Sequence, residues 1–221
     1  MTPVCHIVCA CPDGSLTLKP QTGDFVVACD GGFALCEAVG IAPDLVIGDF
    51  DSLDAQVAAG ISCERIELPW EKDDTDLVAA LRLCLQQGWR SFRIHNALGG
   101  DVGHTIAAIS ALAWLRQQGA QAVLEGAGQA GIIVMPQDGV VHLNALCSTP
   151  ALSKGTRVSV SAFGGSAQGV CERDLHWEVD GITLEPETSV GVSNQVEGAD
   201  PRISVAAGKL LVIVGGEGAH A

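Results

Sequence analysis

The feature that most constrains the fold of this chain is a change in its hydrophobic pattern near residue 140. Before it, short apolar runs alternate with segments of helical period, which predicts strands and helices in turn and a largely parallel sheet covered on both faces. After it, the runs are short, often alternate in polarity and are split by glycine-rich turns. We therefore predict an α/β N-terminal domain with a mostly parallel sheet, over 1–138, and an all-β C-terminal sandwich domain, over 139–221.

Two segments of the first domain have the clearest helical period. In 74–87 the apolar residues fall on one face, acidic residues begin the segment and Gly88 follows its end; 104–118 stops at Gly119. A shorter helix is expected over 33–39. Strands are expected at 5–10, 25–28, 45–47, 66–68, 91–97, 121–125 and 132–135, then at 140–145, 157–162, 170–173, 181–184, 191–195, 203–206 and 209–214.

The charge balance restricts the possible partners. The formal net charge is −14, and the 12 lysines and arginines form no basic stripe. Such a surface repels nucleic-acid backbones and anionic membranes, so neither is an expected partner. No apolar run reaches membrane-spanning length. A polyphosphate ligand would have to be held through a metal ion or backbone N–H groups, because cationic side chains are scarce.

The nine cysteines indicate the compartment. Most lie within apolar runs, where a reduced thiol behaves as a small hydrophobic group. The N-terminal segment has no basic region and no adequate apolar region, so no signal peptide is expected. We expect a reducing, cytoplasmic location without a disulfide framework.

Two aspartates follow a predicted strand in the segment GDFDS, 48–52. In open α/β sheets ligands bind outside the carboxyl ends of the strands. Asp49 and Asp51, two positions apart on a loop, can both turn toward one hard cation, and Mg²⁺ is usually held by one or two carboxylates together with substrate phosphates. The alternative is that one of them caps a following turn.

A second acidic segment, KDDTD, begins the helix expected over 74–87. Acidic residues in a first helical turn are common, and that explains Asp74 and Asp76. It does not readily explain Lys72 and Asp73 as well, and a lysine beside an acidic metal site can contact a phosphate.

Two glycine-rich segments each precede a predicted helix. One is Cys29-Asp30-Gly31-Gly32, and the other spans 99–104, with Gly99, Gly100 and His104. Glycines before a helix allow a phosphate to approach free N–H groups. A turn that needs positive φ, or a solvated cap histidine, would use the same residues. No GxxxxGK[ST], GxGxxG after a strand, HExxH or GxSxG segment is present.

In this order, CDGG (29–32), APDLVIGDFDSL (42–53), KDDTD (72–76) and GG followed by His104 resemble the thiamine pyrophosphokinase family. The resemblance continues in DLHWEVDGITL (174–184) and GVSNQVEG (191–198). It implies an α/β domain joined to a β-sandwich in a homodimer, with the active site at the subunit interface. It also implies that diphosphate passes from ATP to the hydroxyl of thiamine, giving thiamine diphosphate and AMP.

The resemblance also implies roles for individual residues. Magnesium would be held by Asp49, Asp51 and Asp73, and these three with Asp76 would form the catalytic set. The ATP and magnesium site would further include Asp30, Gly31, Gly32, Lys72, Asp74, Thr75, Gly99, Gly100 and His104. Thiamine would lie against Trp177, Ser193 and Asn194.

This chain departs from the family pattern on the acceptor side. Where the family has GGRxDH, Asp101 replaces the arginine and Gly103 replaces the acid; Ala108 replaces an asparagine, and Phe33-Ala34 ends the segment that is usually GGAN. The reversed charge at Asp101 is expected to weaken phosphate attraction or alter the dimer contact. The loss at Gly103 removes a candidate partner for the aminopyrimidine of thiamine.

These departures leave two alternatives open. The same reaction could act on another heterocyclic alcohol, such as a hydroxymethyl-pterin. The chain could also be a non-catalytic module that binds a nucleotide or thiamine, although its costly acidic clusters persist.

Overall fold

The computed structural model describes residues 2–11, 16–50, 60–71, 73–146 and 152–215. The chain forms two compact units, Met1–Ala127 and Gly128–Ala221, whereas the sequence analysis places the boundary after residue 138. The difference arises from β7 (Gln129–Val134), an apolar strand that pairs antiparallel with β14 (Leu210–Gly215) of the second unit.

The sheet of the first unit is parallel, as predicted. Its order is β6-β5-β1-β2-β3-β4, and each described pair of neighbours runs in the same direction. The strands are β1 (Cys5–Val8), β2 (Phe25–Cys29), β3 (Leu45–Gly48), β4 (Glu64–Glu67), β5 (Ser91–His95) and β6 (Gln121–Gly126).

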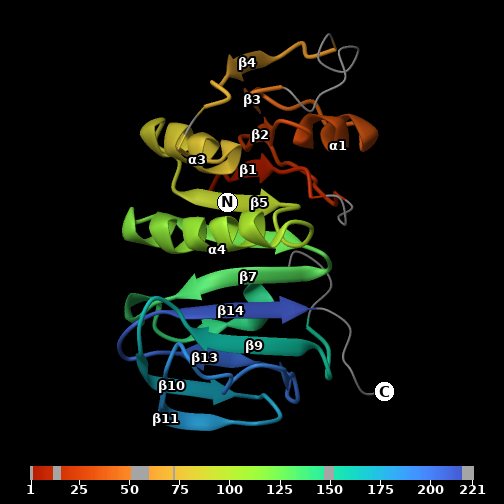
Figure 1. Cartoon of the computed structure of the whole chain (residues 1–221). Coiled ribbons are helices and arrows are strands. Elements are labelled where there is room, and N and C mark those ends of the chain that lie inside the picture. Colours follow the sequence, from red (N-terminus) through yellow and green to blue (C-terminus); the bar gives the residue numbers. More distant parts are fainter. Residues whose placement is uncertain (1, 12–15, 51–59, 72, 147–151, 216–221) are drawn as a thin grey trace. The chain divides into compact units, whose positions relative to one another are not determined.

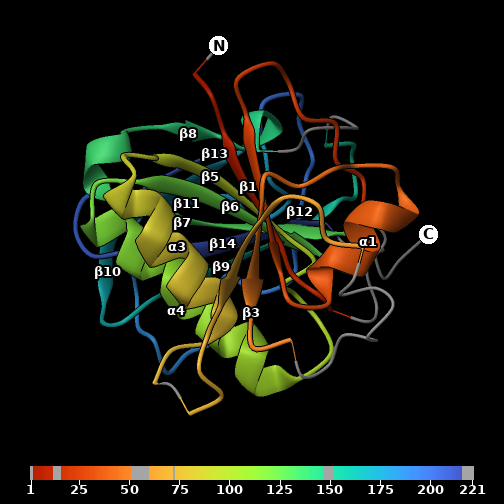
Figure 2. The same ribbon diagram turned by 90° about the horizontal axis from the view of Figure 1, so that it is seen from above.

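Helices cover both faces of this sheet. On one face α1 (Gly32–Ala38) places Phe33 and Cys36 in a cluster with Val8 of β1. Side chains alternate along a strand, so Cys5 lies on the other face, where it meets Cys84 of α3 (Asp76–Gln86). Figures 1 and 2 show α3 beside α4 (Val102–Gln117), and the two helices are in contact.

Side-chain caps fix where the two long helices begin. The Oγ1 atom of Thr75 accepts a hydrogen bond from the N–H of Val78 at 3.3 Å, so α3 begins at Asp76 rather than at the expected residue 74. The carboxylate of Asp101 accepts one from the N–H of His104 at 2.9 Å, so α4 begins two residues earlier than expected.

A chain of polar side chains crosses β1, β5 and β6. His6 Nε2 lies 3.2 Å from a carboxylate oxygen of Asp24, His6 Nδ1 lies 3.0 Å from His95 Nε2, and His95 Nδ1 lies 2.9 Å from Glu125. Arg93 is also paired with Glu125. Burial lowers the pKa of His6. Burial alone would raise the pKa of Glu125, but its contacts with His95 and Arg93 lower it.

The second unit is built from two antiparallel sheets, in agreement with the predicted all-β pattern. Their orders are β12-β9-β14-β7 and β11-β10-β13-β8. The remaining strands are β8 (Val141–His142), β9 (Arg157–Ala162), β10 (Ala167–Arg173), β11 (Val179–Leu184), β12 (Asn194–Gln195) and β13 (Arg202–Ser204); two single-turn 3₁₀ helices, Pro136–Asp138 and Leu143–Ala145, lie near β8.

Two strands of the second unit are much shorter than expected. The expected strand over 140–145 ends at His142, because the chain turns into the 3₁₀ helix Leu143–Ala145. The expected strand over 191–195 is reduced to its last two residues, because Gly191 and Ser193 both have positive φ, 94° and 64°. No helix among the described residues has the length and apolar content needed to cross a membrane.

Candidate active site

A pocket of about 530 Å³ opens at the carboxyl edge of the parallel sheet, within the first unit. From β1 the chain proceeds to β2, β3 and β4 on one side, and β5 and β6 lie on the other, so the strand order reverses between β1 and β5. Ligands of open α/β sheets bind at such a point. The segments that follow β1 and β5 are joined here by backbone hydrogen bonds from Cys9 to His95 and from Cys11 to Asn96.

Three half-buried aspartates gather in this pocket. One carboxylate oxygen from each of Asp30, Asp49 and Asp76 lies within 4.8 Å of the other two. Asp30 follows β2, Asp49 follows β3, and Asp76 begins α3. Three partly desolvated carboxylates at this separation repel one another unless a cation lies among them, and carboxylate oxygens are the ligands that Mg²⁺ prefers. We call Asp30, Asp49 and Asp76 the aspartate triad.

Close backbone packing places the triad. Asp30 adopts a left-handed conformation, with φ of 45°, and its N–H donates to Ile47 O at 2.9 Å. A Cβ on Gly48 would lie 2.9 Å from the Cβ of Asp30, and one on Gly32 would lie 2.1 Å from the carbonyl oxygen of Val8. These glycines therefore let the strand ends approach each other, which is how Asp30 comes beside Asp49.

The other residues of the two acidic segments lie in different positions. Asp73 is exposed and lies outside both the triad and the pocket lining. Asp74 is paired with Arg82, two helical turns along α3, at 2.8 Å. Thr75 lines the pocket and caps α3. The predicted residues Asp51 and Lys72 lie outside the described part of the chain.

The loop before α4 reaches the pocket through Gly99, Asp101 and His104. The carboxylate of Asp101 caps α4, which accounts for an acid where the family pattern has an arginine. Gly99 and Gly100 have φ of 101° and 62°, so both need the conformational freedom of glycine. The N–H and carbonyl groups of Gly99 both contact the hydroxyl of Thr105, at 3.3 and 3.1 Å.

Sequence reasoning missed several residues that line the pocket. Asn96 is 4% exposed, and within the described residues its Nδ2 has no hydrogen-bond partner. Its φ of 52° is one that asparagine tolerates, so an asparagine directly after a strand was the available signal. Cys9, Cys11 and Cys29 also line the pocket, and their positions at strand ends could have marked them.

Asn194, a predicted thiamine contact, is buried and uses its amide within the second unit. Its Oδ1 accepts from the N–H groups of Trp177 and Gln195 at 3.1 and 2.9 Å. Its Nδ2 donates to Trp177 O at 2.8 Å and to a carboxylate oxygen of Glu172 at 2.9 Å. Burial raises the pKa of Glu172. Asn194 therefore holds the backbone of Trp177 in place.

The side chain of Trp177 is available to a ligand or to another protein. It is 59% exposed and meets the ring of His176 edge to face, with 4.6 Å between centroids. Ser193 is exposed, and its N–H donates to Ser159 Oγ at 3.1 Å.

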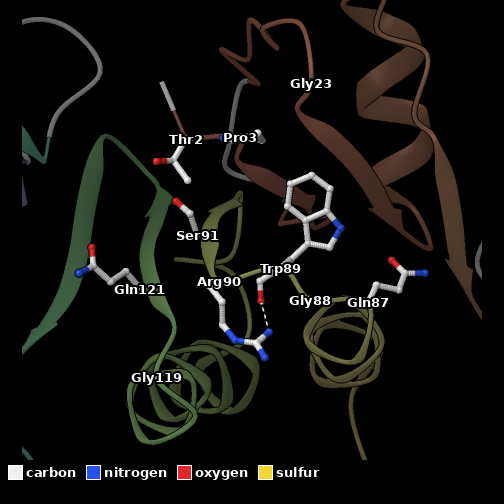
Figure 3. Close-up of a pocket in the computed structure, with 10 residues that line it drawn as sticks. All are labelled: Thr2, Pro3, Gly23, Gln87, Gly88, Trp89, Arg90, Ser91, Gly119 and Gln121. Carbon is white, nitrogen blue, oxygen red and sulfur yellow. Dashed lines mark hydrogen bonds between the residues drawn. The ribbon is translucent and has the colours of Figure 1, made fainter.

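A second hollow of about 650 Å³ lies at the amino ends of the strands of the first unit (Figure 3). It is lined by Thr2, Pro3, Gly23, Gln87, Gly88, Trp89, Arg90, Ser91, Gly119 and Gln121. Arg90, the charged residue of this set, donates to the carbonyl groups of Leu85 and Trp89 and so caps the end of α3. This set of described residues contains no carboxylate, so the smaller pocket with its aspartate triad is the candidate active site.

Comparison with known proteins agrees with this choice. Residues 19–124 match the profile of the family described as thiamin pyrophosphokinase, catalytic domain. Over these residues the chain is similar to the thiamin pyrophosphokinase family. This range contains the whole aspartate triad, and the family and the class of enzyme predicted from the sequence are confirmed.

Solved thiamin pyrophosphokinases share the fold along nearly the whole chain. The Bacillus subtilis enzyme superposes with a TM-score of 0.84 at 19% identity, covering 97% of this chain and 99% of that one. The Enterococcus faecalis family member gives 0.80 at 24% identity, covering 98% and 100%. The yeast enzyme gives 0.72 at 14% identity, covering 96% and 86%. No curated protein matches the sequence.

Proposed function

We propose that this chain transfers a diphosphate group from ATP to the hydroxyl of thiamine, giving thiamine diphosphate and AMP. The observation that carries the proposal is the aspartate triad, which lies at the strand-order reversal within the matched catalytic domain. Phosphoryl-type transfer requires mainly positioning and charge neutralisation, and both can be provided at this point of the fold.

The proposed metal site consists of Asp30, Asp49 and Asp76, and Mg²⁺ fits their three carboxylate oxygens. Once bound there, the ion would neutralise charge on the phosphates of ATP. This set keeps Asp49 from the sequence-based proposal. Asp51 remains a proposed ligand from the family resemblance, and Asp73 is the less favoured member because it is exposed.

With Mg²⁺ bound, the pocket would hold a polyphosphate with little help from cationic side chains. Among the described residues, its lining contains no lysine or arginine, and His104 is its one potentially cationic residue. The lining includes Asp76, the first residue of α3, and Asp101 and His104 at the amino end of α4. The amino end of a helix carries a partial positive charge and free N–H groups. These helix ends would orient the polyphosphate beside the triad.

In the proposed reaction, the hydroxyl oxygen of thiamine attacks the β-phosphorus of ATP. The bond from that phosphorus to the oxygen bridging to the α-phosphate breaks, and AMP leaves. One carboxylate of the pocket accepts the proton released by the hydroxyl. Trp177 and Ser193 are the proposed thiamine contacts, and Asn194 supports Trp177.

A coupled assay for AMP tests the reaction. Purified full-length chain with Mg²⁺, ATP and thiamine should release AMP in proportion to thiamine, and a hydroxymethyl-pterin serves as the control acceptor. Absence of thiamine-dependent AMP would contradict the proposal, and AMP release with the pterin alone would assign another acceptor.

We also propose a homodimer, as the family resemblance implies, in the cytoplasm, as the cysteine content implies. Trp177, Val190 and Val192 of the second unit are large apolar residues that are each about half exposed or more, which supports a covered surface there. Light scattering should give twice the mass of the chain, and Val192→Asp should reduce it toward the mass of one chain.

A further inference from the structure

Two cysteines of the pocket lie side by side at the ends of neighbouring strands. The parallel register pairs Val8 of β1 with Ala28 of β2, so Cys9 and Cys29 are the next residues on each strand. Neighbouring strands lie about 4.8 Å apart, within the Cα separation that a disulfide bond spans. Paired residues of parallel strands point to the same face of the sheet, so this register places the two thiols next to each other.

The two thiols differ in how accessible they are from the pocket. Cys9 and Cys29 both line the pocket, but Cys29 is 5% exposed whereas Cys9 is half-buried. A small reagent that enters the pocket therefore reaches the sulfur of Cys9 first, with the sulfur of Cys29 behind it. This arrangement combines an accessible thiol with a second thiol that can resolve its oxidised form.

The same sheet contains a matched pair without that access. Cys5, at the other end of β1, meets the thiol of Cys84 on α3. Both residues are fully buried, and neither lines the pocket or the second hollow. Thiol proximity is therefore common to the two pairs, and only one of them faces a cavity.

We propose that Cys9 and Cys29 form a reversible disulfide bond when a hydroperoxide enters the pocket, and that this bond closes the pocket to nucleotide. The sulfur of Cys9 attacks the peroxide, and the S–O bond of a sulfenic acid forms as the O–O bond breaks. The departing oxygen takes the proton of the Cys9 thiol and leaves as water or alcohol. The sulfur of Cys29 then displaces the hydroxyl from this sulfenic acid. The S–S bond forms as the S–O bond breaks, and the Cys29 proton leaves with the hydroxyl as water. The two sulfurs supply the two electrons that reduce the peroxide.

The bond acts on the aspartate triad through the chain itself. Cys29 directly precedes Asp30, whose left-handed backbone and hydrogen bond to Ile47 bring its carboxylate beside Asp49. Gly31 packs against Ala10, the residue after Cys9, with only 3.0 Å for a Cβ. Joining Cys9 to Cys29 would shift this tightly packed segment and Asp30 with it. The effect on nucleotide rests on the proposed function, whereas bond formation does not.

Bond formation is measured on the full-length chain alone. The reduced protein is exposed to hydrogen peroxide, remaining thiols are blocked with N-ethylmaleimide, and the digest is searched by mass spectrometry for joined peptides. We expect a Cys9–Cys29 link that dithiothreitol removes, that Mg²⁺ with ATP slows, and that is absent in Cys9→Ala and Cys29→Ala. A Cys84→Ala variant should form the link at the wild-type rate.

Nucleotide binding is then measured with a fluorescent ATP analogue and Mg²⁺, before oxidation, after it and after reduction. Oxidation should weaken binding by about tenfold or more in the wild type and in Cys84→Ala, with recovery on reduction. Cys9→Ala should keep its own untreated affinity after peroxide.

The proposal is overturned if the link does not form, if Cys5 and Cys84 join equally fast, or if the linked protein binds nucleotide as before. If the reduced protein binds no nucleotide, the proposed function fails, and the mass-spectrometric result still decides whether the pair is a peroxide-sensitive site.

Discussion

At the residue scale, the three carboxylates of the aspartate triad come from three separate segments. They can hold one metal ion only if the fold keeps all three close together. Asp49→Asn keeps the size of the side chain and removes one charge from the proposed metal site. We expect turnover to fall by about a hundredfold or more, since loss of one such electrostatic contact costs on the order of 3 kcal/mol in the transition state. Excess Mg²⁺ should restore only part of it.

Two further substitutions make this result specific to the triad. Glu71→Gln removes the same charge from an exposed position next to the second acidic segment, and it should leave turnover within about twofold of wild type, as expected of a screened surface charge. Asp73→Asn distinguishes the aspartate triad from the ligand set predicted from the sequence, which includes Asp73. A loss of turnover as large as that of Asp49→Asn would mean that Asp73 belongs to the metal site. Wild-type turnover in Asp49→Asn would remove the triad from the mechanism.

Glu172 provides a second test at this scale, through stability. Burial raises the pKa of its carboxyl group, so the folded protein holds this proton at pH values where the unfolded chain, with the ordinary value of 4.5, has released it. Stability is therefore complete below pH 4.5 and decreases as pH rises through the folded pKa. Glu172→Gln retains an acceptor for Asn194 and cannot ionise.

The variant should match the wild type near pH 4 and exceed it in melting temperature at neutral pH. In a chain of this size each kcal/mol corresponds to about 2–4 °C. Glu187→Gln, on an exposed turn, makes the same chemical change and should show no such pH-dependent gain. A Glu172→Gln variant that is less stable than wild type at neutral pH would show that the charged form is the one that Asn194 stabilises.

At the element scale, α4 shows that one side chain can both begin a helix and line a binding site. Asp101 caps α4 and lines the pocket, so it stabilises the helix while its charge opposes a polyphosphate. Asp101→Asn keeps a good capping residue and removes the charge; Asp101→Ala removes both. We expect Asp101→Ala to lower stability by about 1 kcal/mol and Asp101→Asn to change it little.

Asp101→Asn and Asp101→Ala should have the same effect on the kinetics, because both remove the charge. Removing one negative charge several ångströms from the phosphates should lower the KM for ATP about two- to fivefold, as a single charge is worth less than about 1 kcal/mol across water. A KM that rises in Asp101→Asn would mean that the carboxylate makes a favourable contact with the nucleotide complex, such as a contact through the metal ion.

The bounds of most helices and strands could be predicted from the sequence to within a few residues, because apolar period and turn residues are local properties. The arrangement of the candidate site could be predicted only in part. GDFDS and KDDTD identified the region, but the grouping of Asp30 and Asp76 with Asp49 depends on the strand register and on the residue at which α3 begins. Asn194 stays a predicted thiamine contact, and its burial against Glu172 depends on tertiary packing. No local pattern contains that information.

At the scale of the whole molecule, the polar chain from Asp24 to Glu125 predicts how the protein responds to acid. The outer nitrogens of His6 and His95 face carboxylates, so the inner nitrogens, 3.0 Å apart, have room for one proton between them. A second proton there would place two N–H groups against each other. Burial acts in the same direction and lowers the pKa of His6.

The consequence is a loss of stability below neutral pH. The unfolded chain takes up a proton at the ordinary histidine value of 6.5, whereas the folded chain resists it, so stability is complete above pH 6.5 and falls as pH decreases below it. Burial alone would raise the pKa of Asp24, but hydrogen bonds from the N–H groups of Gln21 and Val4 lower it. The pKa of Glu125 is likewise lowered, by its contacts with His95 and Arg93. These two carboxylates therefore add to the loss of stability only at lower pH. Glu172 has the opposite sign, so it partly offsets this trend in the wild type.

Melting temperatures between pH 7.5 and 5.5 test this dependence. The wild type should lose stability steadily over this range. His6→Gln should show a smaller slope whatever its stability at neutral pH, because the slope reports proton uptake, whereas the removal of a hydrogen bond lowers stability at every pH alike. His142→Gln, at an exposed site in the second unit, should keep the wild-type slope. Equal slopes in His6→Gln and wild type would mean that groups outside this chain of side chains cause the acid sensitivity. A reduced slope would mean that the buried histidine pair limits the stability of the protein in mild acid.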